Sequence, residues 1–289
     1  MHIPDGFLST PVWAALDAAA APAVGLIARR AQRTFDDSKV PLLGVMGAFV
    51  FAAQMINFPV GPGTSGHLVG GALLAYTLGP AAASVVLTAI VTIQALVFQD
   101  GGILALGANV LNMAILGVLA GYLPYHFWGR TRGRRLAIFA GGALSVLTSA
   151  VLALSELLFS GIRMPGTVLG VSLGLFAVSA LVEGAITLGA IRALEAIQPD
   201  FICRPDARRS FALGAVALAA VLLVTGGVLL ASSAPDGIER LGSARALFST
   251  PFSGYDIAAL GRGWFPKAAA GLVGLGLVYG VCLIIGRRR

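Results

Sequence analysis

Apolar stretches long enough to cross a lipid bilayer recur along almost the whole sequence. Hydrophobic residues make up 57% of the chain and charged residues only 11%, and the mean hydropathy is +0.88. A bilayer-spanning helix needs about 20 apolar residues, and several stretches approach or exceed that length. The strict alternation of apolar and polar residues that marks membrane barrel strands is missing. The sequence therefore predicts an all-α polytopic protein of the cell membrane and excludes a water-soluble domain.

We expect about nine transmembrane segments. One of them, residues 67–78, is too short to cross a bilayer as an ordinary helix and fits a helix covered by its neighbours. The expected segments are residues 11–28, 40–56, 67–78, 81–98, 103–123, 136–159, 167–191, 211–231 and 266–286.

Basic residues gather on one side of this predicted topology. With the N-terminus outside and the C-terminus in the cytoplasm, 15 of the 20 lysines and arginines fall in cytoplasmic loops. Cytoplasmic loops carry such an excess, so the net charge of +7 reflects orientation beside membrane lipid, and we expect no nucleic-acid partner. The cytoplasmic set is Arg29, Arg30, Arg33, Lys39, Arg130, Arg132, Arg134, Arg135, Arg192, Arg204, Arg208, Arg209, Arg287, Arg288 and Arg289, and the outer set is Arg163, Arg240, Arg245, Arg262 and Lys267.

The first two residues offer three nitrogen atoms that the chain already joins. They are the Met1 amine, the His2 backbone amide and the His2 imidazole. Bound to one ion they close a five-membered and a six-membered chelate ring, which suits an ion that favours planar nitrogen ligands, such as Ni²⁺ or Cu²⁺, with Co²⁺ as a further guest. We expect Met1 to be retained, because His2 is not small and no signal peptide is visible.

A fourth nitrogen must come from elsewhere in the chain, and His67 is the best candidate. It ends an outer segment, residues 57–67, whose prolines and glycines rule out a regular helix. The third histidine, His126, falls in a predicted cytoplasmic loop and so cannot reach the same site.

Six polar residues near these segments are candidates for orienting the ligands. Asn109 and Asn112 share a helix face and either hydrogen-bond between helices or orient ligands. The full set is Asn57, Thr64, Ser65, Asp100, Asn109 and Asn112.

Several uncommon motifs in this order resemble one family. The start Met1–Leu8 and the segments Gln54–Val60, Gly63–Gly71, Phe98–Gly102 and Leu106–Met113 are similar to the CbiM/NikM family. The resemblance covers roughly residues 1–200. It implies a substrate-binding membrane component of an energy-coupling-factor (ECF) transporter of the ABC type, importing Co²⁺ or Ni²⁺. It also implies metal ligands that map onto Met1, His2 and His67.

The C-terminal part resembles a second component of these transporters. Pro235–Glu239 looks like the Pro-Asp-Gly-Leu-Glu motif of the small N-type subunits, with Ile238 in place of Leu. We therefore expect a metal-binding domain at 1–205 and an N-type module at 206–289. Fusions of this kind resemble fused nickel transport proteins, which favours nickel slightly, although the same nitrogens serve both ions.

The chain has no glycine-rich phosphate-binding loop of the G-x-x-x-x-G-K-[ST] type, and no nucleophile–base set indicates an enzyme. We expect no organic cofactor. The resemblance implies that a CbiQ/NikQ-like transmembrane coupling subunit and two cytoplasmic CbiO/NikO-like ATPase subunits drive transport. Small residues at four-residue spacing, Ala15, Ala19 and Ala23, either pack against that coupling subunit or pack internally.

Two other classes stay open on the sequence. Glu156 and Glu183 lie within predicted spans, where ionisable side chains commonly carry function. They would be the relay groups of a secondary cation carrier. A membrane anchor for another complex, with no ligand of its own, is the remaining alternative.

Overall fold

The structure is a computed structural model of the 289-residue chain. It describes residues 1–34, 39–198, 201–202, 211–245, 247–261 and 263–287. The predicted domain boundary at 205/206 lies outside the described residues, as do six of the arginines used to orient the chain. These are Arg204, Arg208, Arg209, Arg262, Arg288 and Arg289.

Helices dominate the described part of the chain, and each predicted span corresponds to a helix. In chain order these are α1 (Thr10–Thr34), α2 (Val40–Gln54), α3 (Gly71–Leu78), α4 (Pro80–Ile93), α5 (Leu106–Asn109), α6 (Val118–Trp128), α7 (Arg134–Phe159), α8 (Gly166–Ile197), α9 (Phe211–Thr225) and α10 (Trp264–Arg287). A π-helical segment, Gln94–Phe98, extends α4, and a second one, Val110–Gly117, joins α5 to α6. Short 3-10 turns occupy Gly227–Leu229, Glu239–Leu241, Ser253–Tyr255 and Ala258–Leu260.

Seven of the helical segments among the described residues are long and apolar enough to cross a membrane. Two of the nine expected spans are shorter. Helix α2 has 15 residues, and α3 has only eight, all of them buried. Helix α3 is therefore covered by protein, as its length predicts, and the count of nine crossings stays a prediction.

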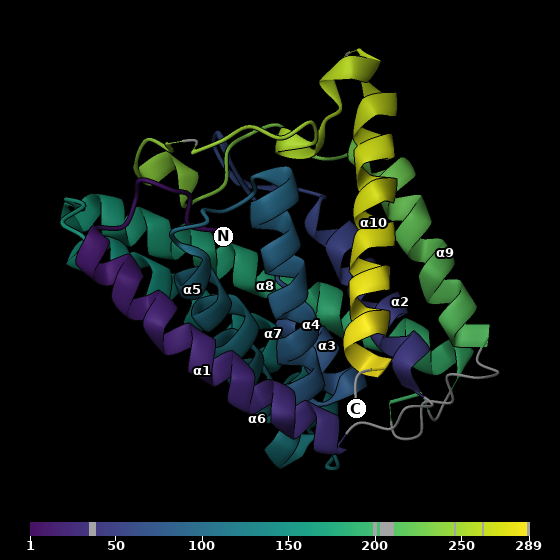
Figure 1. The fold of residues 1–289 in the computed structure, drawn as a ribbon. Helices are drawn as coiled ribbons and strands as arrows, with labels where there is room; N and C mark the ends of the chain where they lie inside the picture. The colour runs from purple at the N-terminus through teal and green to yellow at the C-terminus, as the bar shows by residue number, and fades with distance from the viewer. Residues whose placement is uncertain (35–38, 199–200, 203–210, 246, 262, 288–289) are drawn as a thin grey trace.

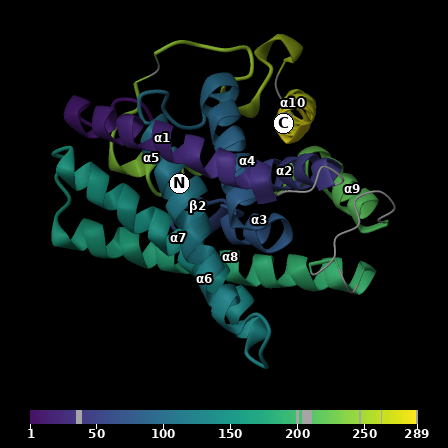
Figure 2. The same ribbon diagram turned by 60° about the horizontal axis from the view of Figure 1, so that its bottom comes forward.

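The helices pack as a bundle in which α7 lies beside α8, and α10 lies beside α2 and α9 (Figures 1 and 2). Helix α1 crosses the other side of the bundle against α4 and α5, with most of its own surface left uncovered. The N-terminus lies among the loops at one end of the bundle, which we call the loop end. Helix α10 runs from this end toward the opposite one (Figure 1).

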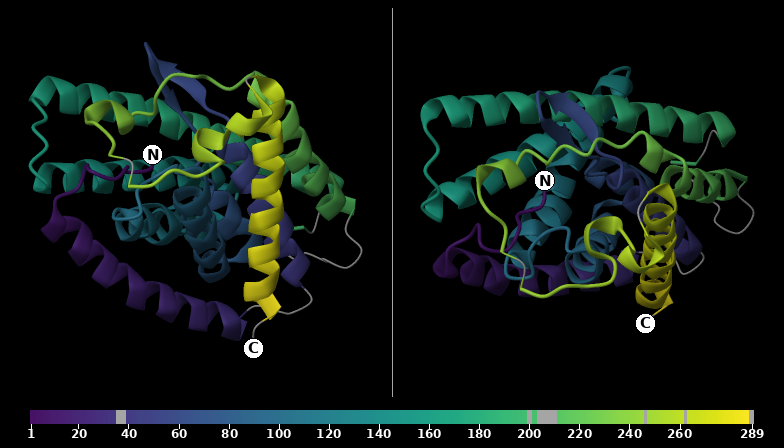
Figure 3. Two further views of the ribbon diagram at one scale, coloured as in Figure 1. Left: turned by 45° about the horizontal axis from the view of Figure 1, so that its top comes forward. Right: turned by 90° about the horizontal axis from the view of Figure 1, so that it is seen from above.

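Two irregular segments shape the loop end. The first is an antiparallel hairpin of β1 (Phe58–Gly61) and β2 (Thr64–Gly66). The second joins α9 to α10, and we call its residues 230–261 the C-terminal strap. Seen from above, this strap runs around the N-terminus (Figure 3). The strap also extends the hairpin, because Ser65 forms a parallel bridge with Asp236.

Candidate metal centre

The first three residues are buried beneath the strap, although they form the end of the chain. Met1, His2 and Ile3 expose 4%, 3% and 0% of their surface. Chain ends are normally mobile and solvated. A buried end of this kind needs partners for its charged amine and its backbone groups.

Hydrogen bonds to the Asn109 side chain and to the loop that precedes it hold this end in place. The Ile3 amide donates to Asn109 Oδ1 at 2.8 Å, and Asn109 Nδ2 donates to the Ile3 carbonyl at 3.0 Å. The Gly102 amide also donates to the Ile3 carbonyl at 2.8 Å. The Asn109 side chain therefore holds the backbone of Ile3, and its role in orienting metal ligands stays a prediction.

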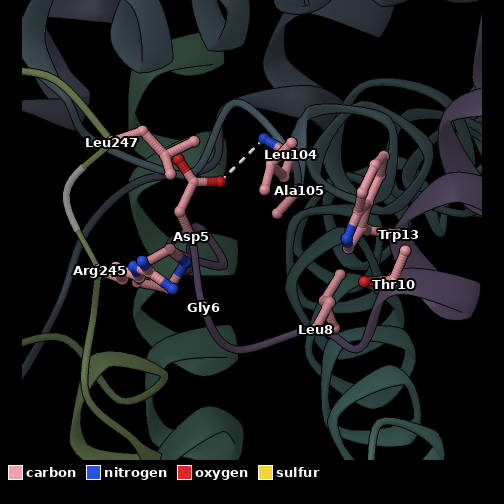
Figure 4. Close-up of a pocket in the computed structure, with 10 residues that line it drawn as sticks. Asp5, Gly6, Leu8, Thr10, Trp13, Leu104, Ala105, Arg245 and Leu247 are labelled. Atoms are coloured by element: carbon pink, nitrogen blue, oxygen red, sulfur yellow. Dashed lines mark hydrogen bonds between the residues drawn. The ribbon is translucent and has the colours of Figure 1, made fainter.

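Asp5 provides a second anchor a few residues further along. Its carboxylate accepts hydrogen bonds from the Ile103 amide at 3.0 Å and the Leu104 amide at 2.8 Å. On its other side, the Arg245 amide donates to the Asp5 carbonyl. Figure 4 shows the hydrogen bond from the Leu104 amide to the Asp5 carboxylate. Gly102 is required here, because a Cβ atom at this position would lie 2.4 Å from Asp5 Oδ1.

His67 follows β2 and precedes α3, so the hairpin rather than the helix fixes its position. Its ring nitrogen Nδ1 lies 2.9 Å from the Leu68 carbonyl. If Nδ1 carries the proton and donates it there, Nε2 keeps its lone pair. The residues that follow Leu68 are held by helix α8, because the Val69 and Gly70 amides both donate hydrogen bonds to the Glu183 carboxylate at 2.8 Å. Gly70 has a positive φ of 75°, which places it at the start of α3 without strain.

Glu183→Gln is expected to weaken this support. Both carboxylate oxygens accept backbone N–H groups, and a glutamine turns one acceptor into a donor facing a donor. We expect a loss of about 1–3 kcal/mol in the free energy of unfolding, measured by thermal melting in detergent. The control is Glu156→Gln, whose remaining carbonyl oxygen can still accept from Asn112 Nδ2. Equal melting temperatures for the two variants would contradict the support assigned to Glu183.

Three nitrogen-bearing groups converge under the strap. Met1 N lies 2.6 Å from His67 Nε2, although the two residues are 66 positions apart. The His2 and His67 rings are stacked, with centroids 5.2 Å apart and planes 9° from parallel. His2 Nδ1 lies 3.1 Å from Asp100 Oδ1, but neither ring nitrogen of His2 has a hydrogen bond of good geometry within the described chain. Buried ring nitrogens without a hydrogen bond are costly, and an ion bound at Nδ1 would satisfy one of the two.

Burial favours the neutral forms of the Met1 amine and the His67 imidazole. It lowers the pKa of the Met1 amine to about 5, although Asp100 and Glu239 act in the opposite direction. The touching Asp236 carboxylate acts in the same direction as Asp100 and Glu239, because it favours the protonated amine. Burial likewise holds the pKa of His67 well below its ordinary value, helped by the amino terminus and His2. Both nitrogens are thus prepared to offer lone pairs near neutral pH.

Asp100 faces His2 from a tight turn built by Gln99 and Gly101, both with positive φ. Burial raises the pKa of the Asp100 carboxyl, but the facing His2 and the Tyr255 hydroxyl outweigh burial, and the pKa lies well below its usual range. The Tyr255 hydroxyl donates to Asp100 Oδ2 at 2.5 Å. Asp100 therefore stays anionic and links His2 to the strap.

Two strap residues at the site were missed by the sequence analysis. Asp236 Oδ2 accepts from the Met1 amine and lies 3.5 Å from His67 Nε2. Tyr255 reaches the site through Asp100. The Pro-Asp-Gly signal around Asp236 was visible, but it indicated a turn and a family motif, and nothing local tied its carboxylate to Met1.

A cavity of about 500 Å³ opens beside these groups, between the bundle and the strap. His67, Asp100, Asp236 and Glu239 all contribute to its wall. A cation in this cavity would meet three carboxylates as well as the His67 imidazole. Among the described residues, no group of three or more His, Cys, Asp or Glu side chains could hold a metal ion.

The remaining predicted residues divide between support and unrelated packing. Ser65 and Thr64 contact the strap through Ala234 and Arg240, and the Asn57 carbonyl accepts from Ser232. Asn112 does not reach the ligands, and its side chain instead donates to Glu156 at 2.8 Å. Of the small residues of α1, Ala15 and Ala19 are exposed, whereas Ala23 is half-buried and packs against the core.

Comparison with known proteins places most of the chain in one family. Residues 2–201 match the family model CbiM, described as the cobalt uptake substrate-specific transmembrane region. A protein of Haloquadratum walsbyi, provisionally named a metal transport protein, is 41% identical over 203 residues, covering 70% of this chain and 93% of that protein. A protein of Archaeoglobus fulgidus, provisionally named the fused nickel transport protein NikMN, is 38% identical over 222 residues, covering 75% of this chain and 73% of that protein. A crystal structure of a truncated transition metal transporter superimposes with a TM-score of 0.60 at 34% identity, covering 68% of this chain and 99% of that one.

Proposed function

The chain belongs to the CbiM family, the membrane components of cobalt and nickel transport, and we propose that it captures Ni²⁺ or Co²⁺ with its own amino terminus. It is a multi-pass membrane protein. The proposed ligands are the Met1 amine, the His2 amide and imidazole, and His67 Nε2. Asn109, Asp100 and Asp5 hold these groups in place through the contacts described above.

The meeting of Met1 N and His67 Nε2 carries this proposal. Two nitrogens that are each about 2 Å from an ion and bound at right angles lie about 2.8 Å apart. The separation of 2.6 Å between Met1 N and His67 Nε2 is close to that value. Planar nitrogen coordination of this kind suits Ni²⁺ and extends to Co²⁺, and the fused relative from Archaeoglobus favours nickel slightly.

We further propose that the protein is the substrate-binding subunit of an ECF-type importer. Its chain lacks a phosphate-binding loop, so two partner ATPases and a transmembrane coupling subunit would supply the energy. The uncovered small residues of α1 suit close packing of that coupling subunit. The site would face outward, with basic loops and the C-terminus inside, and residues 206–289 would form an N-type module over a 1–205 metal-binding domain.

The direct test is calorimetric titration of the untagged protein in detergent with NiCl₂ and with CoCl₂. We expect one ion per chain, tight enough to survive desalting, with metal content then measured by plasma mass spectrometry. Mg²⁺ is the control, because it prefers oxygen ligands and octahedral geometry. A native chain that retains neither ion would refute the proposal.

The pH dependence of binding gives a sharper prediction. Metal binding displaces the protons of its ligands, and the His2 amide always contributes one. The Met1 amine, with its pKa lowered to about 5, contributes a second proton only in more acidic solution. Affinity should therefore fall about tenfold per pH unit between pH 8 and 6, and about a hundredfold per unit or more below pH 5.

Competition with a chelator of known affinity at each pH measures these slopes. An exposed amino terminus would stay protonated at neutral pH, because its ordinary pKa is 8.0. A steep slope that extends up to pH 8 would therefore show that the amine is not buried as described.

A further inference from the structure

The Met1 amine is in contact with a carboxylate from the other end of the chain. Asp236 Oδ2 accepts from the amine and lies 3.5 Å from His67 Nε2. An ion bonded to both nitrogens would lie beside this carboxylate, because Oδ2 touches one nitrogen and is near the other. Asp236 thus borders the site itself, although it follows Met1 by 235 positions.

The strap is fixed to the element that carries His67. The Ser65 amide donates to the Pro235 carbonyl at 3.0 Å, and Ser65 Oγ donates to the Ala234 carbonyl at 2.6 Å. Ser65 precedes His67 by two residues, so these bonds fix the spacing between Asp236 and the imidazole. Nearby, Ile238 is fully buried and anchors the next turn of the strap.

Hydrogen bonds within the strap also fix the direction of the Asp236 carboxylate. Its other oxygen, Oδ1, accepts from the Ile238 amide at 2.6 Å, closing a turn. The Asp236 amide in turn donates to Glu239 Oε2 at 3.0 Å. With Oδ1 engaged, Oδ2 is left directed at the amine. The carboxylate is therefore preorganised before any ion is present.

We propose that Asp236 is a positioning residue of the metal centre, which latches the amino terminus against His67 in the metal-free protein. This inference rests on the proposed metal-binding function and adds a role for the strap within it. Without the latch, the chain end of nine residues before α1 would need to be ordered by the arriving ion. Ordering groups during binding lowers affinity, and preorganisation recovers it.

The reactivity of the Met1 amine tests the latch without any metal. The protein is purified in chelator and treated briefly with an amine-reactive N-hydroxysuccinimide ester, and labelling of the N-terminal peptide is followed by mass spectrometry. Lys39 and Lys267, the only lysines in the sequence, are internal references. The native amine should react much more slowly than these lysines.

Asp236→Asn should increase the labelling rate of Met1 about tenfold or more, the factor expected when a contact with a charged group is lost. The variant keeps Oδ1 as an acceptor for Ile238, so the turn is preserved. Asp236→Glu, which keeps the charge, should recover part of the protection. Asp256→Asn is the matched control, because its carboxylate belongs to the same strap and makes no contact with Met1 or His67 within the described chain.

Nickel titration of the same proteins forms the second arm. Asp236→Asn should weaken Ni²⁺ binding by about 10–100-fold, and Asp256→Asn should not. A native amine that labels as fast as the lysines, or equal protection in Asp236→Asn, would overturn the latch. Protection that depends on Asp236 in a protein that binds no Ni²⁺ would support the latch and refute the proposed metal function.

Discussion

A chain carrying an acetyl group on the Met1 amine is expected to lose tight binding of Ni²⁺ and Co²⁺. The acetyl group turns the Met1 amine into an amide, whose nitrogen offers a lone pair only after it loses a further proton. It also has no room, because Met1 is buried with its nitrogen against His67 and Asp236. We expect the dissociation constant to rise by about a thousandfold or more, equivalent to about 4 kcal/mol. Titration of purified protein measures this change.

Two controls separate the lost amine from general damage. A glycine added after the last residue should leave affinity unchanged. A leader peptide that a protease removes to leave Met1 as the first residue should block binding before cleavage and permit it afterwards, in one preparation. Unchanged affinity in the acetylated chain would rule out the amino-terminal chelate.

The positions of the helices were predictable because a membrane imposes a simple requirement. Backbone polar groups in lipid must pair within the segment, so length and hydropathy alone located each helix, including the short, buried α3. The hairpin was not predicted. The prolines and glycines of residues 57–67 indicated only that a regular helix is impossible. Its second strand also pairs with the strap, about 170 residues further on, and no local pattern indicates that contact.

The candidate ligands were predictable for a different reason. Met1 and His2 are joined by the chain, so their chelate needs no tertiary structure, and His67 followed from the shortage of other outer histidines. Asp236 and Tyr255 were missed because their roles depend on where the strap lies over the bundle. Nothing in the Pro-Asp-Gly motif itself distinguishes a metal-site carboxylate from an ordinary turn.

Asn109 and Asn112 have different hydrogen-bond partners, although they are the same residue type and lie three positions apart. Three positions apart on a regular helix, they would share one face. A π-helical segment begins at Val110, directly between them, and its wider turn changes which neighbours the following residues meet. Asn109 pairs with Ile3, whereas Asn112 pairs with Glu156. The sequence alone gives little warning of such a change in helix type.

Removal of the His67 imidazole is expected to have the second large effect. His67→Ala leaves the proposed fourth position to water while Met1 and His2 remain. We expect Ni²⁺ affinity to fall by about a hundredfold or more, equivalent to about 3 kcal/mol, and His2→Ala to be at least as damaging because it opens the six-membered ring. Titration of each purified variant, beside metal uptake by cells that also express the partner subunits, measures both effects.

His126→Ala is the matched control for these substitutions. His126 lies near the end of α6 among aromatic side chains, with its ring 5.9 Å from Tyr122 and 5.1 Å from Phe127, and it contacts none of the proposed ligands in the described structure. Its loss should leave Ni²⁺ affinity within about twofold of the native value. Free imidazole should also restore part of the Ni²⁺ binding in His67→Ala, because the cavity that His67 lines has a volume of about 500 Å³. An alanine variant at 67 that binds Ni²⁺ as tightly as the native chain would exclude His67 from the coordination of the ion.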